Sequence, residues 1–171
     1  MLIGDGARRA ALVARAQSLG LENVMFQPYQ PREHVRESLS LPDMHIVSLD
    51  ERLEGLILPS KFVGVLAMGR PVLWIGAADG EVGSLVRAFG CGVTVPSGDA
   101  VALTHVLREL SDDHANGGTR LRAMAQQALC ALAQSLSGAG CARCLGKDDR
   151  AVRPPQATTC VIRFDSKSDL F

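Results

Sequence analysis

The chain has 171 residues, a length that suits one domain with a tail rather than two full domains. Its 18 basic and 18 acidic residues cancel to a formal net charge of zero, which argues against binding nucleic acid or an anionic membrane through a broad charged field. An anion would have to be bound at a local site. No apolar run reaches the length of a membrane span, and no basic-then-apolar leader pattern opens the sequence. We therefore expect a cytoplasmic protein that touches the inner membrane only through an acceptor or a partner.

Apolar segments alternate with helical patterns over the first 137 residues, and short turns rich in Gly and Pro join them. Strands are expected at 2–3, 23–26, 44–49, 72–75 and 92–95, and helices at 7–19, 32–39, 60–68, 81–89, 100–110 and 119–136. Such an alternation specifies an α/β fold with a doubly wound, Rossmann-like parallel sheet. Asp99 and Thr119 are of the residue types that cap helix starts.

The most informative stretch of the chain is the turn Pro59-Ser60-Lys61, which opens a helix directly before the apolar strand 72–75. A helix start offers free backbone N–H groups, and this one adds a hydroxyl and an ammonium group. A lysine at that position opposes the helix dipole, which favours a bound anion over a simple surface lysine. Ser60 can equally be a phosphate donor or only the cap of the helix.

Two further turns follow strands and open helices. Gly80-Glu81 comes after strand 72–75, and Gly4-Asp5-Gly6 comes after strand 2–3. Neighbouring turns of this kind form a crevice at the carboxyl edge of the sheet, where ligands bind in open α/β folds. Each turn also has an ordinary interpretation, because Glu81 is favourable at any helix N-terminus and Asp5 can cap the helix after it.

These turns, in their order and spacing, resemble a known family. The likeness covers residues 2–136 and is to the C-terminal, nucleotide-sugar-binding half of GT-B glycosyltransferases, especially bacterial group 1 enzymes of surface polysaccharide biosynthesis. The segments that carry it are Gly4-Asp5-Gly6, Pro59-Ser60-Lys61, Ala67-Met68-Gly69-Arg70-Pro71, Gly80-Glu81 and Gly98-Asp99.

The resemblance implies that residues 1–137 bind a nucleoside diphosphate sugar, with a UDP-sugar favoured, for transfer to a saccharide or lipid-linked acceptor. It implies neither a metal nor a cofactor, and it assigns no catalytic residue. The implied donor-binding residues are Gly4, Asp5, Gly6, Pro59, Ser60, Lys61, Gly80 and Glu81. Relatives carry one more strand at the centre of the sheet and an N-terminal acceptor domain. We therefore expect a fragment, inactive alone, whose acceptor is bound by a separate domain or polypeptide.

One departure from the family concerns two glutamates, eight positions apart, that retaining members carry. The matching positions here are Leu56 and Gly64, and the nearby Glu51 and Glu54 are out of register. The departure therefore weakens the case for ribose recognition through the second of these positions. A non-catalytic remnant or nucleotide-sugar binding module is the main alternative to a transferase. A sugar-nucleotide epimerase of the same architecture is less favoured, because the Pro-Ser-Lys turn fits the transferases better.

Residues 138–171 have no apolar period and no caps, so we expect them to be mostly disordered and outside the core, with 158–164 the single candidate strand. The pair Cys141 and Cys144 could begin a zinc site. Only Cys130 and Cys160 remain as further ligands, at irregular spacing, so zinc is not expected. His45 lies inside an apolar strand and is expected to be a core histidine.

Overall fold

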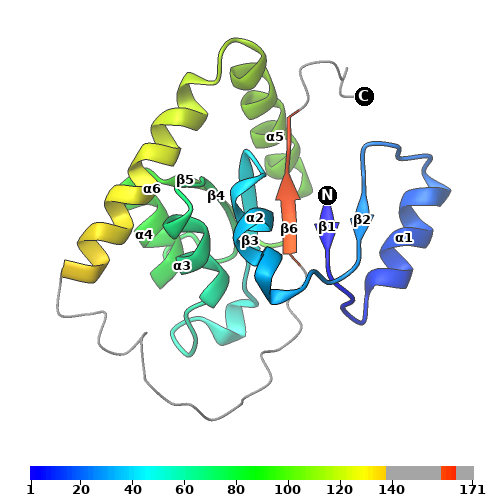
Figure 1. The fold of residues 1–171 in the computed structure, drawn as a ribbon, viewed down its shortest axis with the longest axis horizontal. Helices are drawn as coiled ribbons and strands as arrows, with labels where there is room; N and C mark the ends of the chain where they lie inside the picture. Colours follow the sequence, from blue (N-terminus) through cyan, green and yellow to red (C-terminus); the bar gives the residue numbers. More distant parts are fainter. Residues whose placement is uncertain (138–158, 165–171) are drawn as a thin grey trace.

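A computed structural model of the chain describes residues 1–137 and 159–164. The strands in these residues form one six-stranded sheet in the order β2-β1-β6-β3-β4-β5 (Figure 1). Their bounds are β1 Leu2–Ile3, β2 Phe26–Gln27, β3 Met44–Ser48, β4 Val72–Ile75, β5 Gly92–Val95 and β6 Thr159–Ile162. All the strand pairs are parallel except the two that β6 makes. The predicted α/β class with a largely parallel sheet is confirmed, and it is compatible with a Rossmann-like domain.

The helices follow the predicted pattern closely. They are α1 Arg9–Ser18, α2 Val35–Ser40, α3 Ser60–Ala67, α4 Glu81–Phe89, α5 Ala100–Ala115 and α6 Thr119–Ser137, with 3-10 turns η1 Arg32–His34 and η2 Glu51–Leu53. Gly90 ends α4 in the left-handed region at φ 62°, which a residue with a side chain rarely adopts. Within the part of the chain that the structure describes, no helix is long and apolar enough to cross a membrane.

Strand β4 is the centre of the core. Val72, Leu73 and Trp74 are fully buried. The strand pairs in parallel with β3 on one edge and with β5 on the other over its whole length. A short apolar run with both faces covered is typical of a parallel strand, as the sequence predicted for this segment.

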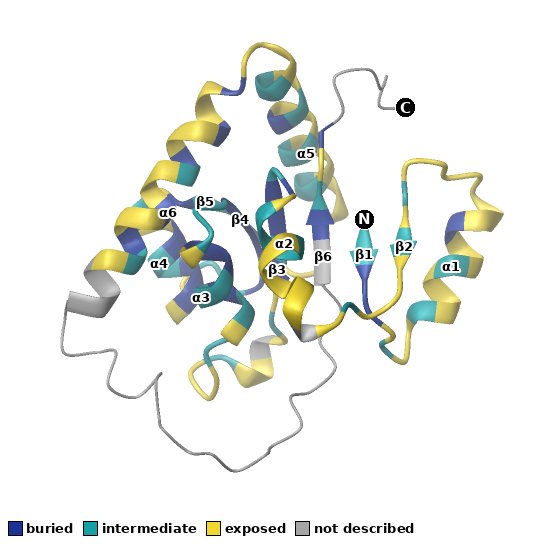
Figure 2. Ribbon diagram, in the orientation of Figure 1, coloured by how far each residue is buried: buried dark blue, intermediate teal, exposed yellow. Residues whose placement is uncertain are grey.

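Alternate residues of the strands pack into two separate apolar clusters. Figure 2 shows the buried positions gathered around β3, β4 and α3. Trp74 belongs to the cluster beneath α3 and α4, together with the later part of α6. Leu73 belongs to the cluster beneath α5, together with the first turns of α6. Helices α3 and α4 therefore cover one face of the sheet, and α5 covers the other.

Strand β6 lies between β1 and β3 and runs antiparallel to both. The expectation that residues 138–171 stay outside the core is wrong for residues 159–164, because Ile162 and Phe164 pack in the cluster beneath α5. The centre of the sheet, where the resemblance implied an absent strand, is occupied by β6. Four residues of high β-propensity suffice to fill a gap that is bounded by hydrogen-bonding strands on both sides. The rest of the predicted tail lies outside the described residues.

The cap of α6 differs from the prediction. Thr119 is the first residue of the helix, and the carboxylate of Asp113 performs the capping. This carboxylate accepts hydrogen bonds from the Arg120 and Leu121 amides, both at 3.0 Å, and from the Thr119 hydroxyl at 3.2 Å. The backbone bond from Arg120 is the main reason why the pKa of Asp113 is lowered from its usual value. A side chain from the end of α5 thus starts α6 and fixes the turn between them.

Replacing Asp113 with Ala should lower the free energy of unfolding at pH 7 by about 1 kcal/mol, the usual value of a helix cap. Since folding depresses this pKa, the stabilisation is present above the pKa of the unfolded carboxyl and is lost as the pH falls through the folded pKa. Urea unfolding at pH 7 and at about pH 3 measures the change, with the exposed neighbour Asp112→Ala as control. An equal loss at both pH values would contradict the capping role.

Candidate functional site

Two helix N-termini open at the carboxyl edge of the sheet. The parallel strands β3 and β4 end in register at Ser48 and Ile75, and the chain continues from them to α3 and α4. Both helices pack on the same face of the sheet, since Phe62 of α3 and Val82 of α4 belong to one apolar cluster. Their first turns therefore lie at the same edge, over neighbouring strands, as predicted from the order of the turns.

Neither of these N-termini has a side-chain cap. Pro59 is the N-cap residue of α3 and Gly80 that of α4, and neither makes a side-chain cap hydrogen bond. Ser60 is the first helical residue and is exposed, so the interpretation of Ser60 as the cap is wrong. Helix α5 is different, because the Asp99 carboxylate accepts the Ala102 amide at 2.8 Å, as predicted. The N-cap residues of α3 and α4 therefore supply no side-chain cap to the first amides of these helices.

Lys61 reaches back from the first turn of α3 to strand β3. Its ammonium group donates to the carbonyl oxygen of Ile46 at 2.9 Å, and the side chain is half-buried. The lysine thus holds a full positive charge against β3, two residues before this strand ends at Ser48. A neutral carbonyl is a weaker acceptor than a charged oxygen would be.

Gly80 lies directly against the side chain of Glu54. A Cβ atom at this position would collide with the carboxylate of Glu54, which comes from the loop after η2. The Oε2 atom of Glu54 is buried without a hydrogen-bond partner. A negative charge therefore lies against the start of α4, where the helix dipole favours it. From the sequence, Glu54 was noted only because it lies near, but not at, the positions of the two glutamates that retaining family members carry.

Glu81 lies in the first turn of α4 and is exposed. Its carboxylate can therefore contact a ligand at the carboxyl edge of β4, the strand next to the one that Lys61 contacts.

The third predicted turn, Gly4-Asp5-Gly6, lies at the carboxyl end of β1. Gly4 is buried, has a φ of 128°, and donates its amide to Gln27 O at 3.1 Å. Asp5 does not cap α1, which begins at Arg9 without a side-chain cap; its carboxylate contacts the Tyr29 amide at 3.3 Å and Arg9 Nε at 3.5 Å. Strand β6 separates β1 from β3, so this turn is about 10 Å along the sheet from the end of β3.

His45 is fully buried in β3, as predicted for a core histidine. Its Nε2 donates to the carbonyl oxygen of Leu39 at 2.8 Å, and its Nδ1 has no hydrogen-bond partner. Burial lowers the pKa of His45 to about 4, and the positive charges of Lys61 and Arg70 act in the same direction. The imidazole is therefore neutral at pH 7 and is a structural group rather than a base.

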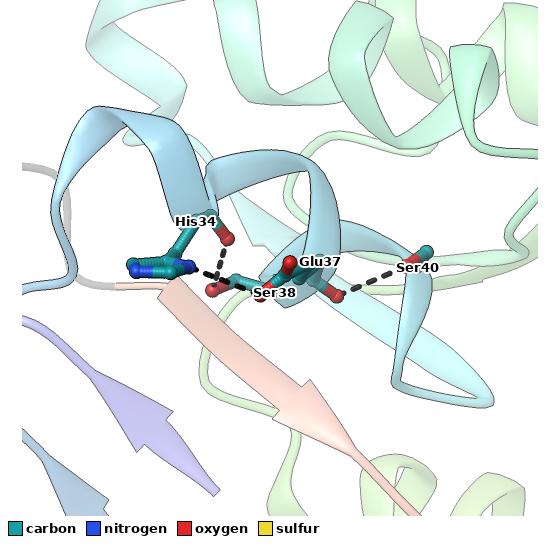
Figure 3. Close-up of polar contacts among 4 residues, drawn as sticks. All are labelled: His34, Glu37, Ser38 and Ser40. Carbon is teal, nitrogen blue, oxygen red and sulfur yellow. Dashed lines mark hydrogen bonds and ion pairs between the residues drawn. The ribbon is translucent and has the colours of Figure 1, made fainter.

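The acceptor for His45 is supplied by helix α2, which is held by local side-chain bonds (Figure 3). Ser38 Oγ donates to His34 O at 2.9 Å, Ser40 Oγ donates to Glu37 O at 3.0 Å, and the His34 ring lies 3.1 Å from the Glu37 carboxylate. These bonds hold the short helix whose last turn presents the Leu39 carbonyl to β3.

His45 should make folding sensitive to mild acid. The unfolded imidazole titrates near 6.5 and the folded one near 4, so stability is full above pH 6.5 and falls as the pH drops toward 4. The total loss is on the order of 3 kcal/mol. Urea unfolding of His45→Gln, which keeps a donor for Leu39, should show a flatter profile between these pH values. The exposed His105→Gln is the control, and a variant profile as steep as that of the wild type would contradict the assignment.

The described residues contain no cluster of three or more His, Cys, Asp or Glu side chains that could hold a metal ion. Cys91 is buried, which raises the pKa of its thiol, and Cys130 is exposed; both are free. The pair Cys141 and Cys144 lies outside the described residues.

Comparison with known proteins gives two informative similarities, although no protein-family profile matches the chain. Over 109 residues the chain is 31% identical to the "Putative colanic acid biosynthesis glycosyl transferase WcaI" of Escherichia coli (strain K12). Over 110 residues it is 26% identical to the "Probable glycosyltransferase WbjE" of Pseudomonas aeruginosa. The matched segments cover 63% and 64% of this chain but only 27% and 28% of these relatives. The similarity therefore concerns about a quarter of each relative.

Proposed function

We propose that residues 1–137 bind a nucleoside diphosphate sugar as the donor half of a glycosyltransferase of polysaccharide biosynthesis. The similarity to two proteins named as glycosyltransferases supports the general activity. In this proposal the domain is the C-terminal half of a GT-B fold. The diphosphate lies at the carboxyl edge of β3 and β4.

The observation that carries this proposal is the pair of uncapped helix starts beside Lys61. The amides that open α3 and α4 face the same edge, and each helix N-terminus carries about half a positive charge. Lys61 adds a full charge in the first turn of α3. In a chain with zero formal net charge, this is a local arrangement suited to an anion.

The same groups would assist sugar transfer. When the bond between the sugar and the diphosphate breaks, negative charge builds on the leaving phosphate oxygens. Lys61 would exchange the Ile46 carbonyl for a phosphate oxygen and form a stronger, charge-assisted hydrogen bond. Donors that are already oriented toward the leaving group stabilise it without reorganisation.

The remaining predicted residues are assigned to the edges of the crevice. Glu81 is proposed to accept hydrogen bonds from hydroxyl groups of the donor sugar or ribose. The turn Gly4-Asp5-Gly6 is proposed to close the crevice from the side of β1. A saccharide or lipid-linked acceptor would be bound by a separate domain or polypeptide. The main alternative is a nucleotide-sugar binding module, which predicts binding of the donor without transfer.

Lys61→Ala should weaken UDP binding ten- to hundredfold, because loss of one charge-assisted contact costs about 1.5–3 kcal/mol. Isothermal titration calorimetry with UDP and UDP-sugars measures the change. Arg108→Ala, which removes an exposed cation from α5, is the matched control and should bind as the wild type does.

The folded state of each variant is checked by its thermal midpoint, because Lys61 also donates to β3. Unchanged affinity in a folded Lys61→Ala variant, or an equal loss in Arg108→Ala, would refute the proposed site.

A further inference from the structure

The first 27 residues, comprising β1, α1 and β2, contribute nothing to either apolar cluster. Ala16 is the one buried residue of α1, and Ile3 is the buried residue of β1. Large apolar side chains in this part and just after it are instead 43–57% exposed: Leu12, Leu19, Leu21, Met25 and Tyr29. In Figure 2 α1 and β2 lie at the edge of the molecule and are mostly exposed. We call residues 1–27 the β1–β2 flap.

In the part of the chain that the structure describes, the strand pairing that joins the flap to the rest of the sheet is that of β1 with β6. Within the described residues β1 pairs only with β2 and β6, over two residues each. Met1 and Val161 exchange two main-chain hydrogen bonds, both at 2.9 Å. The flap therefore depends on a short run of main-chain bonds rather than on core packing.

The opposite edge of β6 is held more firmly. It pairs with β3 over three residues, and Ile162 O accepts the Asp43 amide at 3.1 Å. The Asp43 carboxylate in turn accepts the Phe164 amide at 3.0 Å, and Ile162 and Phe164 pack with Met44 in a core cluster. Of the two seams of β6, the one toward β1 is thus the weaker.

We infer that the β1–β2 flap opens at the seam between β1 and β6 while β6 stays on β3. The flap carries the turn Gly4-Asp5-Gly6 at the carboxyl edge, on the far side of β6 from Lys61. Opening would move this turn away from α3, and closing would return it to the carboxyl edge of the sheet, beside β6. Tyr29 to Pro31 join the flap to η1 and form the hinge.

The inference that the flap closes over a ligand rests on the proposed donor site. A nucleoside diphosphate that contacts both sides of the crevice binds the closed state better, and by linkage it then favours closure. Opening itself does not depend on the ligand, so the two claims can fail separately.

Hydrogen exchange of the full chain, followed by NMR, tests the seam without a ligand. The Val161 amide bonds to Met1 and reports the β1 side, while the Asp43 amide bonds to Ile162 and reports the β3 side. We expect Val161 to exchange at least tenfold faster than Asp43. Equal rates would overturn the inference.

A variant of the seam gives a second test. Val161→Pro removes the donor to Met1 and should speed tryptic cleavage after Arg15 of α1 at least tenfold, because a 10-residue helix is not stable alone. Cleavage after Arg87 of α4 should not change. Val101→Pro, at an exposed position in the first turn of α5 where proline is tolerated, controls for the introduction of a proline as such. Faster cleavage at both arginines to the same degree would show that β6 supports the whole core, which overturns the flap.

Addition of UDP separates the two claims. If UDP binds by calorimetry, it should slow cleavage after Arg15 at least tenfold in the wild type. Binding without slower cleavage would overturn closure over the ligand. Absence of UDP binding would refute the proposed function and, with it, closure, but would leave the exchange result for the seam standing.

Discussion

The parallel register between β3 and β4 is the constraint on which the proposed site depends. The two strands pair from His45 and Val72 to Ser48 and Ile75, so they end at the same level. The helices that follow pack into one cluster around Trp74. Because the strands end at the same level and the helices pack on the same face, the first turns of α3 and α4 both lie at the carboxyl edge of the sheet. A change in this register would separate Lys61 from the start of α4.

The electrostatics of the edge combine local positive potential with two nearby carboxylates. Lys61 and two helix N-termini provide positive potential in a chain whose formal net charge is zero. Glu81 is exposed in the first turn of α4, and the Glu54 carboxylate lies against Gly80. A diphosphate that binds here has to displace this carboxylate from the start of α4. Gly55, which follows Glu54 and has a φ of 74°, gives the loop a bend that a residue with a side chain would resist.

Much of the fold could be predicted from the sequence, for identifiable reasons. Strand 72–75, helix 81–89 and strand 92–95 were predicted to the residue, because Gly and Pro mark their limits and their apolar periods are regular. Residue type also identified Asp99 as a cap. It failed for Ser60 and Asp5, because α3 and α1 have no side-chain cap, and for Thr119, because the capping group of α6 is set by tertiary structure. The cap of α6 comes from Asp113, on the preceding helix.

The position of β6 could not be predicted for the same reason. Residues 159–162 were part of the candidate strand that the sequence offered, but their place in the sheet is set by the gap between two strands that are distant in sequence. Likewise, the contact of Glu54 with Gly80 joins two loops that no local pattern connects. The sequence located the turns of the candidate site, whereas their distances along the sheet required the structure.

The central claim is that a nucleoside diphosphate binds at the shared edge of α3 and α4. An NMR titration of the ¹⁵N-labelled chain with UDP tests it most directly, because each backbone amide reports its own environment. We expect the largest shifts on the amides of residues 60–62 and 80–82, at the start of both helices. Shifts confined to α5 and α6, or saturation of binding without any shift at these two turns, would contradict it.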